Sequence, residues 1–572
     1  MYSPLRGAIA LSFLLHLARA QNVTDFDWAN LEPSEDLRYT PCYDGFRCAR
    51  LLVPLDWTEP PSDSQAKAAI AILTLPATVD PADPSFGGAI FINPGGPGGS
   101  GVTMNLRAGR RIQRIVDGKK HYEIVSFDPR GIGFTTPPAD CYQRDEFARG
   151  GASLERRAVG GFSEGLNVVR RHFARSYGHG SLCNHTANGF MTTASVSRDM
   201  VEMVDRIEEL RKRNTGVRGP YTKPKPDSQR PLGGTDDHQE VARLQYFGFS
   251  YGTVLGNTFA SMYPNRVGRM VLDGVEDIYD YYSTNWALNL GDTEKTVDYF
   301  YERCFRATAA RCPLRQPRDT EWQDIKARME KFIADLGNNP VSYIASNRAH
   351  VITNYDVLEA IVGPIYSPID YFPKLAVTLA AAITGNFTPL VEGLHLPGPE
   401  HNCPLPGGQA LSEYTWSGDA MSAIACGDGD DITSETPASY AEYAARLLKD
   451  SPTLGNSWGD IRLSCVGWRV RPKWRYTGPF GASGPTGKAG GEKSTAAPLL
   501  FTSSRLDPVT PLRHAFAMSK LFPRSSVVIQ ESVGHCAVSA PSMCTKKIIE
   551  KYFETGMCSA SGRSENVEPT LC

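Results

Sequence analysis

Short apolar runs bounded by turn-forming residues recur along the chain, and this pattern is typical of the buried strands of a parallel sheet. Segments between the runs carry apolar residues at helical spacing, as in 193–212 and in 253–263, which directly follows a strand. The alternation predicts an α/β fold with a mostly parallel sheet and helices on both of its faces. The predicted strands are 67–75, 89–92, 122–127, 244–247, 269–272, 498–502 and 527–529.

The pattern changes after Asp273, where long helical stretches replace the alternation of strands and helices. The strand pattern returns only at 498–502. We therefore predict a large, mainly helical cap inserted into a sheet that resumes afterwards. The helical stretches are 293–308, 320–336 and 355–383, the last interrupted by prolines at 364, 368 and 373. The expected parts are a signal peptide at 1–20, the first part of the core at 21–275, the cap at 276–455 and the rest of the core at 456–572.

The first twenty residues have the pattern of a secretory signal. Arg6 precedes a short apolar run at 8–17, and an A-x-A cleavage site follows at 18–20. A buried N-terminal helix or an uncleaved anchor is the alternative, but the run is too short to span a bilayer. Thirteen cysteines fit an oxidising compartment. We predict a secreted, extracellular protein with possible N-glycan sites at Asn22, Asn184 and Asn386.

Composition narrows the classes of function. Of 572 residues, 41% are apolar and 21% are charged, which is typical of a globular protein. Lys+Arg number 60 against 62 Asp+Glu, so there is no basic excess to bind a nucleic-acid backbone. No later stretch is long and apolar enough to cross a membrane. We expect neither a nucleic acid nor a membrane as a partner.

The cysteines indicate disulfides rather than a metal centre. Short separations favour the pairs Cys42–Cys48 and Cys304–Cys312, and the odd total leaves at least one thiol free or paired between chains. A metal site was considered where His172, His179, Cys183 and His185 lie close in sequence, but their spacing matches no zinc pattern. A glycosylated surface loop is the preferred interpretation there, and no metal is predicted.

A candidate nucleophile stands between a strand and a helix. The motif Gly248-Phe249-Ser250-Tyr251-Gly252 follows the strand 244–247 and precedes the helix 253–263. A serine on so tight a turn is exposed on strained backbone, and the flanking positions must be glycine or very small to avoid collision. Ser250 is therefore the predicted nucleophile.

A base and an orienting acid follow in the order that this architecture requires, Ser, acid, His. His535 comes after the last strand and Asp507 after the strand 498–502. Their separation leaves room for a helix at 512–521 and one strand. A helix-capping Asp and a surface His are the plainer alternatives. Sites in open α/β sheets lie at the carboxyl ends of strands, which favours the catalytic interpretation.

The turn after the second strand, Asn93–Gly101, is rich in glycine. Acyl transfer requires backbone donors for the developing oxyanion. Prolines 94 and 97 have no N–H, so we predict that Gly96 donates together with Tyr251.

The same turn contains G-x-G-x-x-G at 96–101, and Asp128 ends the next strand. A dinucleotide-dependent oxidoreductase is therefore an alternative, although it would leave Ser250, Asp507 and His535 without a role. We predict no cofactor.

Several motifs, taken together, resemble the secreted tripeptidyl aminopeptidase branch of the α/β-hydrolases, which is related to the proline iminopeptidases. The resemblance covers most of the mature chain. It implies release of short peptides from free N-termini by a Ser250, Asp507 and His535 triad beneath a cap. The segment 213–239 is longer than the usual link of the family, a difference that bears on access to the site. The motifs are 93–101, 128–133, 248–253, 270–275, 423–426, 465–468, 507–511 and 534–536.

The resemblance also implies carboxylates near the cap that bind the ammonium group of the substrate. Glu276 and Asp277 follow the fifth strand at a suitable place, although two solvated loop acids are the simpler interpretation. We predict a secreted serine exopeptidase of α/β-hydrolase fold that acts on a peptide. A secreted carboxylesterase acting on small esters and a catalytically silent binding protein are the alternatives, because fold alone does not fix function.

Overall fold

A computed structural model describes residues 26–184, 186–215, 241–345, 347–394, 414–482, 494–557 and 570–572. Within these residues one large sheet has the order β1-β2-β3-β5-β4-β6-β7-β10-β11-β12. Strands β5, β4, β6, β7, β10, β11 and β12 run parallel to one another, whereas β1, β2 and β3 pair antiparallel at one end, where β3 meets β5. The strands of this sheet are β1 (Thr40–Cys42), β2 (Phe46–Pro54), β3 (Lys67–Leu75), β4 (Phe86–Asn93), β5 (His121–Phe127), β6 (Leu244–Phe249), β7 (Val267–Asp273), β10 (Leu499–Leu506), β11 (Ser526–Val533) and β12 (Thr570–Leu571).

Helices cover both faces of the sheet, as the sequence predicts. One apolar cluster joins the sheet to α4, α5 and α16, and a second joins its other face to α1 and α17. The central strands are buried on both sides, which explains why their sequences are almost continuously apolar. The helices of these layers are α1 (Gly101–Val116), α4 (Thr193–Thr215), α5 (Tyr251–Met262), α16 (Leu512–Ser519) and α17 (Met543–Thr555).

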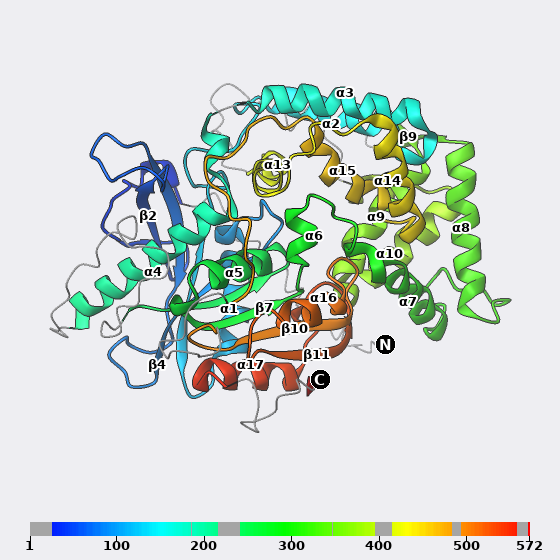
Figure 1. Ribbon diagram of the computed structural model, residues 1–572. Coiled ribbons are helices and arrows are strands. Elements are labelled where there is room, and N and C mark those ends of the chain that lie inside the picture. The colour runs from blue at the N-terminus through cyan, green and yellow to red at the C-terminus, as the bar shows by residue number, and fades with distance from the viewer. Residues whose placement is uncertain are drawn as a thin grey trace, which may run out of the picture.

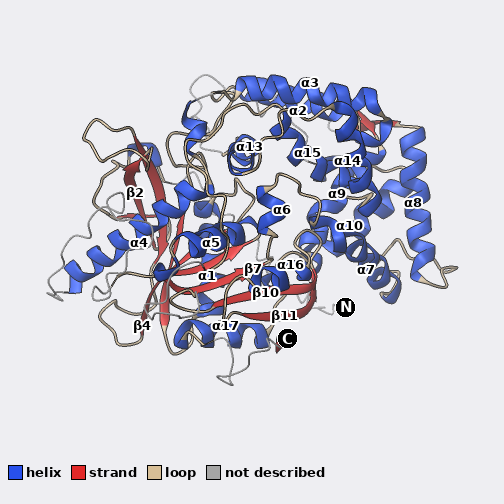
Figure 2. Ribbon diagram, viewed as in Figure 1, coloured by secondary structure: helices blue, strands red, loops and turns tan. Residues whose placement is uncertain are grey.

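A separate helical layer stands beside the carboxyl ends of the strands and has an apolar core of its own (Figure 2). It includes a two-stranded antiparallel hairpin, β8 (Val341–Ala345) and β9 (Arg348–Ile352). Its helices are α2 (Glu146–Val159), α3 (Leu166–Leu182), α7 (Thr293–Arg306), α8 (Trp322–Asn338), α9 (Asn354–Tyr366), α10 (Pro368–Ile383), α11 (Thr388–Gly393), α14 (Pro437–Asp450) and α15 (Gly455–Val466). Helices α6 (Ile278–Tyr282) and α13 (Ser417–Asp428) pack instead in the apolar cluster of the sheet.

This layer draws on sequence from outside the expected cap segment 276–455. Phe162, Val169 and Phe173 pack in the same apolar cluster as residues of α7, α9, α10 and α14. Helix α3 runs along α14 and α15 (Figure 1). Packing therefore joins a stretch before Ser250 to the helices that come after it.

The prolines of 355–383 interrupt the helix at one place only. Ser367 separates α9 from α10 with non-helical backbone (φ −135°, ψ 71°), because the residue before a proline disfavours the helical conformation. Pro368 then opens α10, where its missing N–H costs nothing. Pro364 and Pro373 lie inside helices, so the interruptions expected at these two positions are wrong.

Among the described residues five disulfides form, and they include both expected pairs. Cys536 is a buried free thiol, in keeping with the odd number of cysteines. The described helices include none that is long and apolar enough to cross a bilayer. The five pairs are Cys42–Cys48, Cys141–Cys183, Cys304–Cys312, Cys426–Cys465 and Cys544–Cys572.

Some expectations fall outside the described residues: the signal peptide, the sequon at Asn22 and most of the loop 213–239. Asn184 and Asn386 are exposed, so both sequons remain predicted glycan sites. The surface loop expected around His172 is wrong, because this residue lies buried in α3 and its Nε2 contacts the carbonyl of Gly160 at 2.9 Å.

Candidate active site

Four loops meet at one edge of the sheet because the strands that carry them are parallel neighbours. Asn93, the last residue of β4, pairs with Gly248 of β6, and β6 in turn pairs with β7. Strand β10 then pairs with β7 on one side and with β11 on the other. The glycine-rich turn and the loops that carry Ser250, Asp507 and His535 consequently emerge side by side.

Ser250 occupies the strained turn that the motif predicts. Its φ of 56° and ψ of −129° are unusual for a residue with a side chain. A Cβ on Gly248 would come within 2.4 Å of the Tyr246 ring, and one on Gly252 within 2.8 Å of the Asn93 carbonyl. The tight packing on both sides explains why glycine flanks this serine at these two positions.

Asp507 and His535 form a buried pair. The Nδ1 of His535 lies 3.0 and 3.1 Å from the two carboxylate oxygens of Asp507. The backbone N–H groups of Val509 and Thr510 donate to one oxygen, and that of Cys536 donates to the other at 2.8 Å. Asp507 is fully buried, so these donors fix both the carboxylate and the imidazole.

When both groups are ionised, Asp507 is negative and His535 is positive, and each charge stabilises the other. Burial alone would raise the pKa of Asp507, but the charge of His535 and the hydrogen bonds outweigh it and hold the pKa below its usual value. Burial alone would lower the pKa of His535, but the Asp507 carboxylate outweighs it and raises the pKa. The geometry therefore stabilises an imidazolium, the species that a general base forms.

The loops of Ser250 and His535 meet at the carbonyl of Asp273. This oxygen accepts from the Ser250 N–H at 3.1 Å and from the Cys536 thiol at 3.4 Å. The Asp273 carboxylate accepts from the N–H groups of Ala537 and Val538, so it anchors the segment after His535. The Nε2 of His535 is buried without a hydrogen-bond partner among the described residues. Catalytic hydrogen bonds often form only when substrate is bound.

The glycine-rich turn lies against the nucleophile. A Cβ on Gly95 would stand 2.8 Å from both the Ser250 Cβ and the Tyr251 nitrogen, so the turn and the start of α5 are in close contact. The Gly95 N–H is already donated to the Asn93 side chain. The Tyr251 N–H belongs to the first turn of α5, where backbone donors have no partner within the helix. Gly96, the other predicted donor, follows directly with a φ of 119°.

The turn between α9 and α10 covers His535. The backbone N–H of His535 donates to the Tyr366 carbonyl at 2.9 Å, and the two rings meet edge to face with centroids 5.0 Å apart. A Cβ on Gly534 would lie 2.7 Å from Pro368. The His535 side chain is only 10% exposed. Sequence reasoning missed Tyr366 and Asp273, because neither belongs to a motif that signals the contact.

Glu276 and Asp277 differ in their surroundings. Glu276 is 6% exposed and accepts from Asn289 at 3.3 Å, so the interpretation as a solvated loop acid is wrong for this residue. Burial, with little compensation, raises the pKa of Glu276 to about 8. Its charge is among those that raise the pKa of His535. Asp277 caps α6 by accepting from the N–H groups of Tyr279 and Asp280.

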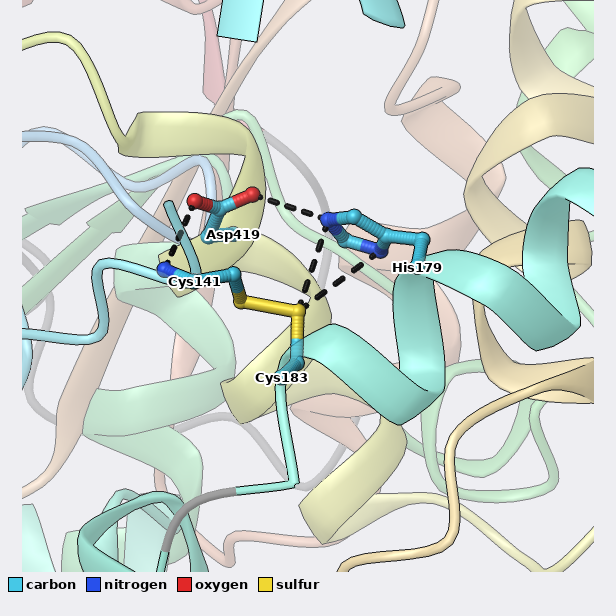
Figure 3. A group of neighbouring side chains, drawn as sticks. All are labelled: Cys141, His179, Cys183 and Asp419. Carbon is cyan, nitrogen blue, oxygen red and sulfur yellow. Dashed lines mark hydrogen bonds and ion pairs between the residues drawn. A yellow bond between two sulfur atoms is a disulfide. The ribbon is translucent and has the colours of Figure 1, made fainter. Parts of the chain in front are cut away.

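One group of side chains has the composition of a metal site: Cys141, His179, Cys183 and Asp419 (Figure 3). The two cysteines are joined as a disulfide, so neither offers a thiolate. The Nε2 of His179 pairs with the Asp419 carboxylate at 2.9 Å. The arrangement is a structural crosslink beside α13.

The alternative of a dinucleotide site depends on a free carboxylate at Asp128. Asp128 is fully buried and accepts from the Ser100 hydroxyl and from the N–H groups of Val102 and Phe134. These bonds tie the glycine-rich turn to the loop after β5 and leave the carboxylate unable to reach a ribose hydroxyl.

Known proteins resemble the chain along most of its length. Residues 451–565 match the family model described as TAP-like protein. Serine protease Hip1 of Mycobacterium tuberculosis (strain H37Rv) is 24% identical over 92% of this chain and 90% of its own. Tripeptidyl aminopeptidase of Streptomyces lividans is 23% identical over 90% of this chain and 82% of its own. Carboxylesterase B of M. tuberculosis (strain CDC 1551) is 35% identical over 27% of this chain and 28% of its own.

The family match includes Asp507 and His535, and the long relatives align with both the sheet and the helical layer. The resemblance inferred from the motifs is thereby confirmed. Residues 451–565 are similar to the TAP-like domain, and the similarity of the whole chain to a serine protease and a tripeptidyl aminopeptidase indicates a serine hydrolase that resembles aminopeptidases.

Proposed function

We propose that the protein is an extracellular exopeptidase that releases short peptides from free N-termini through an acyl-enzyme on Ser250. The observation that carries this proposal is the buried Asp507–His535 pair on strand ends adjacent to the strained Ser250 turn. Two long relatives named as a serine protease and a tripeptidyl aminopeptidase support it.

In the proposed mechanism neutral His535 removes the Ser250 hydroxyl proton through Nε2 as Oγ attacks the scissile carbonyl. The Asp507 carboxylate holds the proton on Nδ1 and stabilises the imidazolium. The Tyr251 and Gly96 N–H groups stabilise the oxyanion. The imidazolium then protonates the leaving amine as the C–N bond breaks, and water hydrolyses the ester by the same steps.

The acyl half of the substrate carries its N-terminus, so an ammonium-binding group must lie near Ser250. We assign this role to Glu276, which is buried and close enough to His535 to influence its pKa. Burial raises the pKa of Glu276 to about 8, so the side chain is largely protonated at neutral pH without substrate, and an ammonium group beside it would favour the carboxylate. Asp277 is engaged as the cap of α6 and is not included in the proposed ammonium site.

The cover over the site also favours chain ends. Tyr366 and Pro368 lie directly on the loop that carries His535. This turn narrows the approach to the site from that side, and an N-terminus needs less room than the middle of a long polypeptide. The five disulfides are in keeping with an extracellular location.

A secreted carboxylesterase is the second candidate, because carboxylesterase B is 35% identical over part of the chain. To separate the two activities, kcat/KM is compared for one chromogenic peptide with a free or an acetylated N-terminus and for short acyl esters. Charged hydrogen bonds contribute about 1.5–3 kcal/mol, so the free peptide should be about 10- to 100-fold better. Equal rates for both peptides together with faster ester turnover would refute the peptidase.

The role of Glu276 has a matched control next to it in the chain. Glu276→Gln removes a buried carboxylate and should abolish the preference for the free N-terminus. Asp277→Asn removes a neighbouring carboxylate but keeps a good helix cap, so the preference should survive. If Glu276→Gln retains the wild-type ratio of the two peptides, another group binds the ammonium.

A further inference from the structure

The two predicted oxyanion donors belong to different segments. Helix α13 contacts the segment of Gly96 directly and is linked to Tyr251 through Thr193. A Cβ on Gly98 would lie 2.6 Å from the carbonyl oxygen of Ser417, in the first turn of α13, so the glycine-rich turn packs directly on this helix. Tyr414, just before α13, donates from its hydroxyl to the Gly98 carbonyl at 2.7 Å. The segment that holds Gly96 is therefore fixed from the side opposite the sheet.

Asp428, in the last turn of α13, is linked through Thr193 to Tyr251, the residue after the nucleophile. Asp428 is fully buried and accepts from the Thr193 N–H at 2.8 Å, the Thr193 hydroxyl at 2.5 Å and the Tyr281 hydroxyl at 2.9 Å. The oxygen of the Thr193 hydroxyl lies 2.5 Å from the Tyr251 hydroxyl. Because Thr193 has only one hydroxyl proton and gives it to Asp428, Tyr251 is the donor in this pair.

Ionisation of Asp428 fixes the direction of these hydrogen bonds. Burial raises the pKa of Asp428 to about 6, opposed by the hydrogen bonds from Thr193 and Tyr281. At neutral pH the group is therefore a carboxylate and can only accept. A chain of buried hydrogen bonds therefore holds the Tyr251 side chain, and with it the backbone of this first residue of α5.

The helix between these two ends is itself anchored. Asp419 accepts from the Cys141 N–H and from His179 at 2.9 Å (Figure 3). It also accepts from Arg149 at 2.8 Å. The Cys426–Cys465 disulfide joins the other half of α13 to α15. These contacts and the disulfide together restrict the movement of α13.

We propose that α13 sets the spacing of the oxyanion hole, with Thr193 and Asp428 as positioning residues that act through Tyr251. The inference rests on the proposed function, because it takes the Gly96 and Tyr251 N–H groups as the donors. A small displacement of either donor weakens transition-state binding without changing how the ground-state substrate binds.

The test compares Thr193→Val, which removes the hydroxyl at nearly constant volume, with Thr193→Ser, which keeps it. Thr193→Val should lower kcat about 10- to 100-fold with KM nearly unchanged, the scale expected for a misplaced catalytic group. A peptide boronic acid, which forms an oxyanion-like adduct on serine, should lose affinity by the same factor. A peptide amide inhibitor without the boron should bind as before, and Thr193→Ser should recover most of the loss.

Tyr251→Phe tests the same chain of hydrogen bonds from the other end and keeps the backbone donor. The double variant should be no worse than the poorer single variant, because both substitutions break one chain of hydrogen bonds. Tyr251→Phe alone decides the matter if Thr193→Val does not fold, since the phenylalanine ring preserves the packing.

Labelling of Ser250 by a fluorophosphonate separates the two levels of failure. If the wild-type protein is not labelled at Ser250, the proposed function fails. If it is labelled but both variants keep wild-type kcat and boronate affinity, only the role of α13 is overturned. A parallel loss of affinity for the amide inhibitor would also overturn it, because general distortion of the site would then explain the effect.

Discussion

Replacing Asp507 by Asn should remove almost all activity and move its dependence on pH. The carboxylate accepts from three backbone N–H groups and from the Nδ1 of His535. An Asn carbonyl can keep the bonds to Val509 and Thr510, but its NH₂ then faces the N–H of Cys536 and the Nδ1 of His535. Two donors cannot pair, so the imidazole turns to the tautomer with its proton on Nε2, where it cannot act as a base.

The expected loss follows from that tautomer. Comparable substitutions in serine hydrolases cost about 10⁴-fold in kcat, which corresponds to about 5 kcal/mol of transition-state stabilisation. The Asp507 carboxylate also raises the pKa of His535 against the effect of burial. Without it, burial acts alone, so the acid limb of the residual activity should move to lower pH.

The assay is kcat/KM for a chromogenic peptide between pH 4 and pH 9, with circular dichroism to confirm the fold. Asp117→Asn is the control, because that carboxylate accepts from the Tyr122 N–H at the end of α1, away from the site. It should leave the pH profile unchanged. Activity within about tenfold of wild type, or an acid limb that moves to higher pH, would refute the assignment of Asp507.

Two further predictions concern stability. Loss of the Cys426–Cys465 disulfide, whose ends are separated by 39 positions in the sequence, should lower the melting temperature more than loss of Cys42–Cys48, separated by 6, because longer loops gain more entropy on release. Equal losses in calorimetry of the two double alanine variants would contradict this. Burial raises the pKa of Asp128 to about 6, so ionisation of this side chain destabilises the fold as the pH rises from about 4 to 6. Over this range the free energy of unfolding of the wild type, relative to that of Asp128→Asn, should fall by up to about 3 kcal/mol. Urea unfolding at both pH values measures it, and a difference that grows with pH would contradict the reasoning.

Local steric rules made part of the site readable from sequence. A serine between two glycines after an apolar strand fits few backbone arrangements, and the structure has the strained turn at Ser250 that the motif predicts. Asp507 and His535 follow strands, and parallel strands end at a common edge, so their meeting could be anticipated. The distinct roles of Glu276 and Asp277 could not, because burial of one and capping by the other depend on packing.

Contacts between distant segments left no local signal. Tyr366 reaches His535 through the turn between α9 and α10, and no spacing in the chain indicates that contact. Asp428 connects to Tyr251 through Thr193, three residues far apart in sequence. The antiparallel strands β1 and β2 at the sheet end were also missed, because β1 has only three residues and β2 carries Arg47 and Arg50 within its apolar run.

The most direct test of the account is to ask which atom of the protein attacks. Purified enzyme is treated with a fluorophosphonate, and the modified peptide is located by mass spectrometry alongside turnover of the chromogenic peptide. The proposed mechanism predicts one adduct, on Ser250, and loss of both the adduct and turnover in a folded Ser250→Ala variant. Turnover that persists in this variant, or an adduct on another residue, would contradict it.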